Sequence, residues 1–469
     1  MKPPFDIAGD LDTPVSAFAK LGAFNPRFLL ESVEGGERLA RYSFIGFGKC
    51  LEVRLDQDGL TVGTSKLPRP ANKAALLEAL RQALAAAPKP LPEMAGVPLA
   101  GGLVGYSSYD VVRYFERLPA RAKADHPVPD LHYVAPESLL VFDHLTRGIA
   151  LLHAGTEEER QALRREVIQA LRGGLPNHST PGNAPRYTPA EASLSPDEYM
   201  AGVKRTQEYI AAGDVYQLVL SARFSGRHSL HPFEAYRALR LINPSPYMYY
   251  CRLGDLTVVG SSPEALVKVN ARGDAQLRPI AGTRPRANGT ADDAAEDARR
   301  EQDLLADVKE NAEHVMLVDL ARNDLGRVAA AGSVHVDPYR VIERYSHVMH
   351  IVSGVKGRIA PGRDAFDLFA ACFPAGTLVG APKVRAMEII DELEPVRRGL
   401  YGGTIGYFGA NGDMDQAITI RTLVFRGDEY SYQAGAGIVA DSVPKTEHEE
   451  VLAKSGVMAL ALKLASEGL

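Results

Sequence analysis

The segment Pro279-Ile-Ala-Gly-Thr-Arg284 opens the stretch that decides the fold, which runs from Arg278 to about Lys454. Two widely separated Glu-x-x-Glu pairs and a late Gly-x-Gly turn follow within it. Carboxylates that crowd together repel each other, and a divalent cation removes that conflict. We therefore predict that these features meet around one magnesium ion and one small dicarboxylate, above a sheet that the rest of the chain helps to build.

The acidic pairs are Glu310 with Glu313 and Glu447 with Glu450, each with helical spacing. Residues three apart share a helix face, and Lys454 extends the face of the second pair. A solvated charged stripe is the usual meaning of such a pattern, and spacing alone favours it. Two helices that aim their carboxylates at one point would instead suit magnesium, which takes one or two protein carboxylates, waters and a substrate oxygen.

The turn Ala434-Gly-Ala-Gly437 follows a predicted strand. Its two glycines, Gly435 and Gly437, would let backbone N–H groups approach an anion closely, although a simple tight turn has the same pattern. Arg421 falls in an alternating strand, and a buried arginine there needs an anionic partner, either a protein carboxylate or a substrate carboxylate. Hydroxyl groups of Tyr401 and Thr377 could add donors.

A histidine pair lies in the segment Tyr345-Ser-His-Val-Met-His-Ile-Val-Ser353. A lone histidine on an apolar strand is more often structural than catalytic. By sequence alone His347 and His350 are equal candidates for a catalytic role.

The pattern of hydrophobic residues predicts a mixed α+β chain with an N-terminal region at 1–175, a linker at 176–196 and a C-terminal region at 197–469. The linker is rich in Pro, Gly, Asn, Ser and Thr. We expect Ser195 to cap a helix from Asp197, strands at 28–32, 41–46 and 51–55 around a turn at 34–37, one long helix at 298–325, and a hairpin of 400–408 with 417–425 around Asn411-Gly412.

Composition excludes several classes of protein. The net charge of -5 over 469 residues disfavours nucleic-acid binding, which would need a basic stripe. No run reaches the ~18 apolar residues of a membrane span. Three widely spaced cysteines, Cys50, Cys251 and Cys372, form no disulfide or zinc pattern, so we expect a reducing cytoplasm.

Five segments together resemble the chorismate-utilising enzyme family, most closely its anthranilate synthases. They are PIAGTR (279–284), LVDLARNDLGRV (317–328), YSHVMHIVSG (345–354), FPAGTLVGAPKVRAMEII (373–390) and AGAGIVADSVP (434–444). The resemblance implies large mixed or antiparallel sheets packed as an α/β/β/α sandwich with helices outside. It also implies amination of chorismate at C2 with loss of the C4 hydroxyl, and then loss of pyruvate to give anthranilate.

The resemblance assigns roles to residues of this chain. Glu313 and Glu450 would hold Mg²⁺, with Glu310 and Glu447 acting through water. His350 and Glu264 would act near C4, since hydroxide leaves only when an acid protonates it. The remaining implied contacts to chorismate are Thr377 and Gly282 at the ring, Thr283 beside it, Tyr401 and Arg421 at the enolpyruvyl carboxylate, and Ala434, Gly435, Gly437 and Lys454 at the ring carboxylate.

Two positions separate this chain from sibling enzymes. The family's aminodeoxychorismate synthases typically carry a nucleophilic lysine where this chain has Ala281. Its isochorismate and salicylate synthases typically use a lysine base where this chain has Gln217, and a neutral amide is a poor base. Both absences favour direct addition of ammonia. Some aminodeoxychorismate synthases lack that lysine, so they remain the alternative, together with a non-catalytic sensor of the same fold.

The resemblance further implies a feedback pocket for L-tryptophan and a separate glutamine amidotransferase subunit. The pocket would be formed by Leu30, Glu31, Ser32, Arg41, Pro246, Tyr247 and Met248, where Glu31 could pair with an α-amino group. Ordinary edge strands would give the same pattern. No cysteine has the setting of a glutamine-hydrolysing nucleophile, so the ammonia donor is expected on another chain.

Overall fold

The computed structural model describes residues 4–32, 41–176, 186–287, 293–344 and 348–469. The turn expected at 34–37, part of the expected linker and His347 lie outside the described residues. The helices are α1 Pro14–Lys20, α2 Lys73–Ala85, α3 Glu157–Leu171, α4 Pro196–Ala211, α5 Pro232–Ile242, α6 Asp293–Ala306, α7 Val308–Gly326, α8 Ala365–Cys372, α9 Lys383–Leu393 and α10 Pro444–Glu467, with short 3₁₀ turns η1 Gly22–Phe24, η2 Tyr109–Tyr114 and η3 Gly376–Leu378.

Strands make up the interior of the molecule. In chain order they are β1 Ile7–Ala8, β2 Phe28–Glu31, β3 Tyr42–Asp56, β4 Gly59–Val62, β5 Ser65–Leu67, β6 Gly102–Ser107, β7 Leu131–Asp143, β8 Gly148–His153, β9 Glu191–Ala192, β10 Gln217–Arg227, β11 Tyr247–Leu253, β12 Leu256–Ser262, β13 Ala265–Val269, β14 Asp274–Leu277, β15 Ile280–Pro285, β16 His335–Val336, β17 Val341–Arg344, β18 Val348–Val352, β19 Val355–Arg358, β20 Gly380–Ala381, β21 Thr404–Gly409, β22 Met414–Ile418, β23 Thr422–Arg426 and β24 Glu429–Ile438.

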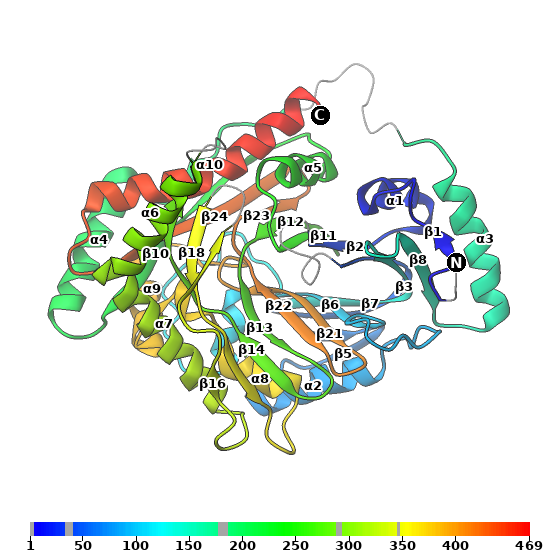
Figure 1. Cartoon of the computed structure of the whole chain (residues 1–469), viewed down its shortest axis with the longest axis horizontal. Coiled ribbons are helices and arrows are strands. Elements are labelled where there is room, and N and C mark those ends of the chain that lie inside the picture. The colour runs from blue at the N-terminus through cyan, green and yellow to red at the C-terminus, as the bar shows by residue number, and fades with distance from the viewer. Residues whose placement is uncertain (1–3, 33–40, 177–185, 288–292, 345–347) are drawn as a thin grey trace.

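Hydrogen bonds join 21 of the described strands into one sheet system, and β15, β18 and β17 form a separate three-stranded sheet. The long pairs β3–β7 and β10–β24 are antiparallel. Helices α4, α6, α7 and α10 lie outside the strands on one side, and α2 and α8 lie below them (Figure 1). The predicted fold class, a mixed α/β chain with large antiparallel sheets, is confirmed.

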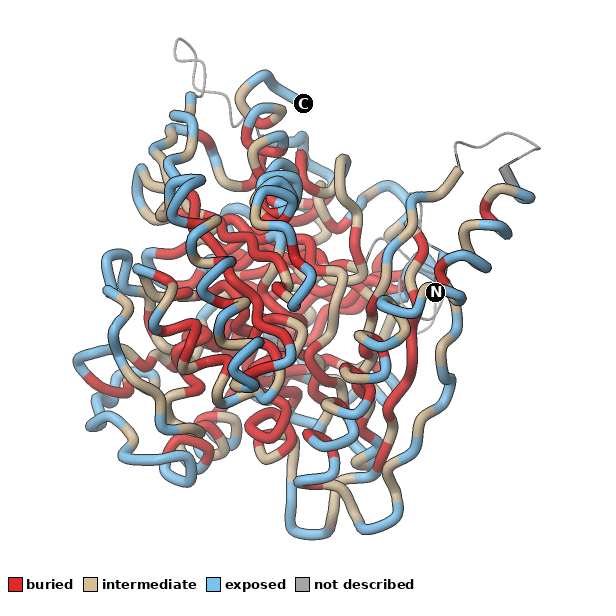
Figure 2. Tube along the Cα trace, turned by 90° about the vertical axis from the view of Figure 1, so that its left-hand side faces the viewer, coloured by how far each residue is buried: buried red, intermediate tan, exposed pale blue. Residues whose placement is uncertain are grey.

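The strands supply most of the buried core. Most strand positions between the helix layers are buried, whereas the outer helix faces and the loops are exposed (Figure 2). Large side chains such as Tyr133, Phe369 and Phe408 are almost fully buried, and burying apolar surface is the main force that holds the layers together.

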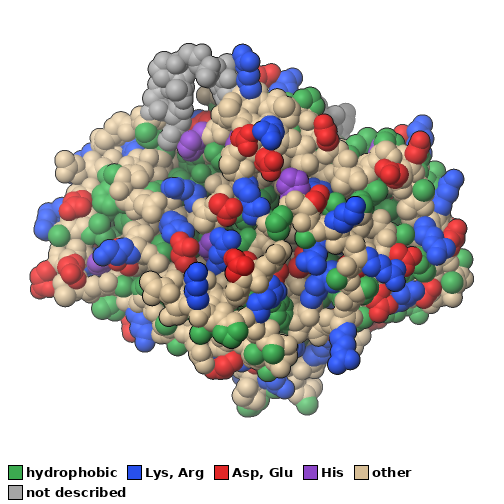
Figure 3. Space-filling model, turned by 180° about the vertical axis from the view of Figure 1, so that it is seen from behind, with side chains coloured by type: hydrophobic (Ala, Val, Ile, Leu, Met, Phe, Trp, Pro, Cys, Tyr) green, Lys and Arg blue, Asp and Glu red, His purple; other side chains and the backbone are tan. Residues whose placement is uncertain are grey.

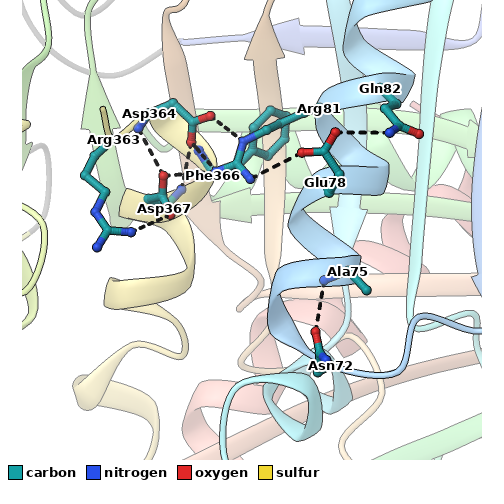
Figure 4. Close-up of polar contacts among 9 residues, drawn as sticks. All are labelled: Asn72, Ala75, Glu78, Arg81, Gln82, Arg363, Asp364, Phe366 and Asp367. Atoms are coloured by element: carbon teal, nitrogen blue, oxygen red, sulfur yellow. Dashed lines mark hydrogen bonds and ion pairs between the residues drawn. The ribbon is translucent and has the colours of Figure 1, made fainter. Parts of the chain in front are cut away.

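The N-terminal and C-terminal parts share this sheet. Strand β2 pairs with β11, and β6 pairs with β21. Arg81 of α2 adds ion pairs to Asp364 and Asp367 at the start of α8, at 2.6 Å and 2.9 Å (Figure 4). Strand pairs and ion pairs therefore join the N-terminal and C-terminal parts. The expected division of the chain at 176–196 stays a prediction.

The boundaries of two expected elements are wrong. The helix expected at 298–325 is two helices, because Asp307 caps α7 by accepting hydrogen bonds from the N–H groups of Lys309 and Glu310. Aspartate is a strong N-cap, and it interrupts an otherwise helical pattern. The strand expected at 51–55 is the second half of β3, which continues through an irregularity between Phe47 and Cys50.

The expected C-terminal hairpin is shorter than the sequence pattern suggested. Strand β21 pairs with β22, but the chain leaves β22 at Ile418, and β23 pairs with β12 and β24 instead. Arg421 has a φ of 49° at this break. The helix expected after Ser195 is confirmed, and Ser195 caps it in a reciprocal bond with Glu198.

Charged side chains of both signs are mixed on the surface. On the face seen in Figure 3, Lys and Arg are interspersed with Asp and Glu. Among the helices of the described residues, none is long and apolar enough to cross a membrane.

Candidate active site

The first part of the site lies where β15 and β18 pair. His350 on β18 places its Nδ1 3.1 Å from Thr283 Oγ1 and 3.0 Å from the carbonyl oxygen of Gly282. Nδ1 can donate to the carbonyl only as N–H, so this contact favours a tautomer that leaves Nε2 as the acceptor. The geometry therefore fixes the imidazole from one side.

Gly282 brings the backbone of β15 close to helix α7. Its φ is 69°, and a Cβ at this position would lie 2.9 Å from Leu304 Cδ1 and 3.2 Å from Glu310 Oε2. Glycine is required here for both the dihedral angle and the space. As a result, the first Glu-x-x-Glu helix lies directly against the strand that orients His350.

The carboxylates of α7 and α10 lie near the same two lysines. The charges of Lys309 and Lys454 act on both Glu313 of α7 and Glu447 of α10. Loss of water raises the pKa of Glu313, and the charge of Glu310 raises it further. The pKa of Glu447 is raised in the same way by burial and then by Glu450. The two acidic pairs therefore share one partly dehydrated region.

The turn expected at 434–437 is wrong, because these residues lie inside strand β24 and pair with β10. Gln217 connects the acidic region to this glycine segment of β24. Its Nε2 donates to Glu313 Oε1 at 3.2 Å, and the same nitrogen lies 2.6 Å from where a Cβ of Gly437 would be. Gly437 pairs with Val219 in the β10–β24 ladder. Any larger residue at 437 would push the amide away from the carboxylate.

The other glycine of this segment, Gly435, lies close to a lysine and a tyrosine. Lys454 Nζ donates to the Gly435 carbonyl at 3.1 Å and pairs with Glu450 at 2.6 Å. A Cβ at Gly435 would lie 2.8 Å from the Tyr401 hydroxyl. Tyr401 and Ala434 are buried. Strand β24 therefore lies between the α10 carboxylates and Tyr401.

Glu264 and Thr377 meet at the opposite end of α7. The Thr377 hydroxyl donates to Glu264 Oε1 at 3.0 Å. Both residues line a cavity of about 40 Å³ together with Leu317 and Leu320 of α7. Removal from water raises the pKa of the Glu264 carboxyl to about 7, although Thr377 and the charge of Arg421 oppose the rise. Glu264 can therefore carry a proton near neutral pH.

The prediction that Arg421 lies on the buried face of an alternating strand is wrong. Arg421 is exposed and lies between two strands, not on the buried face of one. Its Nη1 lies 3.5 Å from Asn243 Oδ1. A left-handed backbone at a non-glycine residue ends the strand alternation on which the prediction depended.

Magnesium was expected from the four glutamates. In the described part of the chain, no three His, Cys, Asp or Glu side chains stand close enough to form a ready-made metal site. Mg²⁺ does not need one, because it keeps several waters and binds through one or two carboxylates plus substrate oxygens. The raised pKa values of Glu313 and Glu447 fit such a group, since a nearby cation would favour their charged forms.

A second, larger cavity lies away from these residues. It has a volume of about 520 Å³, and all seven residues predicted for the control pocket line it: Leu30, Glu31, Ser32, Arg41, Pro246, Tyr247 and Met248. The paired strands β2 and β11 bring them together. The buried carboxylate of Glu31 accepts a hydrogen bond from Tyr236 and pairs with Arg240 at 3.2 Å.

Sequence reasoning missed several polar residues around the site. Arg284, in the same segment as Gly282, pairs with Asp307 at 2.8 Å and lies 3.5 Å from Glu310. The available signal was its place in the same short segment as Gly282; strand alternation could not give its direction, because the register of β15 shifts between Ala281 and Thr283. The buried pair of Glu394 and Arg398 was visible only as an i,i+4 spacing.

Comparison with known proteins places this geometry in a family. Residues 25–460 match the family of chorismate binding enzymes. The chain is 47% identical over 465 residues to anthranilate synthase component 1 of Thermus thermophilus, covering 98% of this chain and 97% of the relative. It is 46% identical to the Pseudomonas aeruginosa protein of that name, covering 99% and 95%.

Solved structures agree with the sequence relatives. Anthranilate synthase component I from Streptococcus pneumoniae superposes with a TM-score of 0.79 at 34% identity, over 96% of this chain and 98% of that one. MenF, the menaquinone-specific isochorismate synthase of Escherichia coli, shares the fold at 17% identity and a TM-score of 0.69, over 96% and 91%. The chain is therefore an enzyme of the chorismate-binding family, within the group of anthranilate synthase component 1 proteins.

Proposed function

We propose that this chain makes anthranilate by a magnesium-dependent amination of chorismate at C2, with loss of the C4 hydroxyl, followed by loss of pyruvate. The observation that carries the proposal is that carboxylates of both helices reach the same stretch of β24. Gln217 joins Glu313 of α7 to Gly437, and Lys454 joins Glu450 of α10 to Gly435. Gln217 and Ala281 support direct attack by ammonia, because neither side chain can serve as an amine nucleophile or as an effective base.

Different side chains would bind the two carboxylates of chorismate. Lys454 and the N–H groups near Gly435 and Gly437 would receive the ring carboxylate. Glu313 and Glu450 would hold Mg²⁺, whose charge would help to neutralise that carboxylate, and Glu310 and Glu447 would act through water. Tyr401 and Arg421 would receive the enolpyruvyl carboxylate. Fixing both ends orients C2 and C4 for reaction.

Two groups would move protons. Protonated Glu264, positioned by Thr377, would donate to the departing C4 oxygen, because hydroxide is a poor leaving group without an acid. His350 would assist the elimination, in which the C2 proton is removed and the C3–O bond breaks to release pyruvate, with its ring oriented by Gly282 and Thr283.

The test of the reaction is product formation. Chorismate, an ammonium salt and Mg²⁺ should give the fluorescence of anthranilate, and EDTA should abolish it. The pH should be high enough to populate NH₃. Release of 4-amino-4-deoxychorismate would select the folate-pathway sibling instead, and no turnover of chorismate would favour a non-catalytic sensor.

We expect activity to fall as pH rises through about 7, since the proposed acid Glu264 works only while protonated and burial raises its pKa to about 7. At a fixed concentration of NH₃, kcat/KM should drop about tenfold per pH unit above that value. Glu264→Gln should no longer show this fall of kcat/KM above pH 7. Its activity at pH 6.5 should be about 100-fold lower than that of the wild type.

Glu158→Gln, at an exposed site on α3, is the matched control. It should keep the wild-type activity and the same fall of kcat/KM above pH 7. If the fall of kcat/KM above pH 7 persists unchanged in Glu264→Gln, a group other than Glu264 causes it.

We propose that L-tryptophan inhibits the enzyme by binding in the 520 Å³ cavity. The cavity has an apolar wall for an indole, and Glu31 offers a carboxylate to an α-amino group. The neighbouring residue Asn243 contacts both Arg421 and Ser261, which supports a link from the pocket to the substrate site.

Ser32→Phe should abolish inhibition while leaving activity without tryptophan close to the wild-type value, because the larger ring fills the cavity. The measurement is anthranilate formation over a tryptophan titration. Ser65→Phe, on the exposed strand β5, should stay sensitive. Wild-type enzyme that is indifferent to millimolar tryptophan would refute the proposed site.

We also propose that a glutamine amidotransferase subunit supplies ammonia. The relatives are named component 1, which supports a second component. Free ammonia should still serve at high concentration. The three cysteines form no disulfide, which supports a cytoplasmic location.

A further inference from the structure

A buried ion pair lies beside Tyr401 and has no part in the scheme above. Glu394 ends helix α9, and Arg398 follows it by four residues. Their side chains are only 3% and 1% exposed. Arg398 Nη2 lies 2.7 Å from Glu394 Oε1, and Nε lies 2.9 Å from Oε2. Burying two charges is costly, so replacement by apolar residues would often be tolerated for stability alone.

The pair is bonded to two elements of the site. Arg398 donates to the carbonyl oxygens of Leu378, at 2.6 Å, and Val219, at 2.8 Å. Leu378 follows Thr377 in η3. The backbone N–H and hydroxyl of Ser221 donate to Glu394 Oε1 at 2.9 Å and 2.6 Å. Ser221 is the ladder partner of Gly435.

The guanidinium also lies over two phenol rings. Its carbon lies 5.5 Å from the ring centre of Tyr401 and 5.1 Å from that of Tyr109. The Tyr401 ring is buried, and its hydroxyl points to the strand at Gly435. A guanidinium at this distance attracts the electrons of the ring, which makes the phenol O–H a stronger donor.

We propose that Glu394 and Arg398 are positioning residues for Tyr401, and that Arg398 strengthens the Tyr401 hydroxyl as a donor to the second carboxylate of the substrate. The inference rests on the proposed function and deepens it. Glu394 holds the guanidinium over the Tyr401 ring through its two-point bond. Arg398 itself does not touch the substrate, so its effect must pass through Tyr401.

A double-mutant cycle tests this dependence. Arg398→Met should raise the KM for chorismate about tenfold, with kcat within about threefold of wild type, since a weakened bond to an anion lowers substrate affinity. In the Tyr401→Phe background the same change should raise KM by less than about twofold. Arg398→Lys should lie between wild type and Arg398→Met, because it keeps the charge and loses the two-point bond.

Arg160→Met is the matched control. Arg160 is 10% exposed, pairs with Glu157 and donates to the Leu151 carbonyl, and it lies on α3 in the N-terminal part. It should leave KM unchanged. Equal increases in KM for Arg398→Met with and without the Tyr401 hydroxyl would overturn the proposal and leave the pair a structural role only.

If Arg398→Met does not fold, Glu394→Gln carries the same test. It keeps the guanidinium but weakens the bond that orients it, so its increase in KM should also vanish in the Tyr401→Phe background. An additive result there would overturn the proposal as well. A wild-type enzyme that makes no anthranilate would instead refute the proposed function, so the two failures are distinct.

Discussion

Replacing Glu450 by glutamine should lower anthranilate formation by a factor of about 100 or more at moderate Mg²⁺ concentration. Glutamine keeps the shape of the side chain but loses the charge, and magnesium binds carboxylate oxygen in preference to amide oxygen. The change also removes the 2.6 Å ion pair that holds Lys454 near the Gly435 carbonyl. The measurement is the initial rate of fluorescence increase over a magnesium titration.

Glu449 offers a close control for this experiment. It is exposed, adjacent on α10, and forms only a 3.8 Å pair with Lys445. Glu449→Gln should behave as wild type, and partial recovery of Glu450→Gln at high Mg²⁺ would show that the loss concerns the metal. Equal activities of the two variants at every magnesium concentration would contradict the assigned role of Glu450.

Replacing His350 by methionine should uncouple the two halves of the reaction. Amination should continue, whereas loss of pyruvate should slow by a factor of about 100 to 10,000, the usual contribution of a positioned proton-transfer group. An aminated, non-aromatic intermediate should therefore accumulate. Chromatography of quenched reactions measures the intermediate, and a coupled lactate dehydrogenase assay measures the pyruvate.

His335→Met is the control, since His335 is exposed on β16 and its Nδ1 lies 3.0 Å from the nearby backbone carbonyl oxygen of Ser333. It should release pyruvate and anthranilate together at the wild-type rate. Anthranilate formation at that same rate by His350→Met would show that His350 has no part in the elimination.

The sequence predicted the fold class and most elements because its periodic patterns were strong. The strand expected at 28–32 and the helix capped by Ser195 lie where apolar spacing and turn residues indicated. Errors occurred where one residue overrides a pattern. Asp307 divides a helical stretch by capping the second half, and Arg421, with its left-handed backbone, lies in the break between β22 and β23.

The candidate site was predictable in residue types but not in its supporting contacts. Acidic pairs and glycines have a local signature, so Glu313, Glu450 and Gly435 could be named from sequence. Contacts such as Gln217 with Glu313, or Arg398 with Val219, join residues about 100 to 180 positions apart. No local pattern encodes them, because they depend on the register of β10 against β24 and on the packing of α7.

The central claim is that carboxylates from α7 and α10 hold one divalent cation at the substrate. Crystals grown with Mn²⁺ in place of Mg²⁺, and with a stable chorismate analogue, test it directly through the anomalous signal of manganese. The account predicts one strong peak bound by oxygens of both Glu313 and Glu450 and by the ring carboxylate of the analogue. A cation bound elsewhere, or an analogue that occupies its site with no manganese beside these two glutamates, would contradict it.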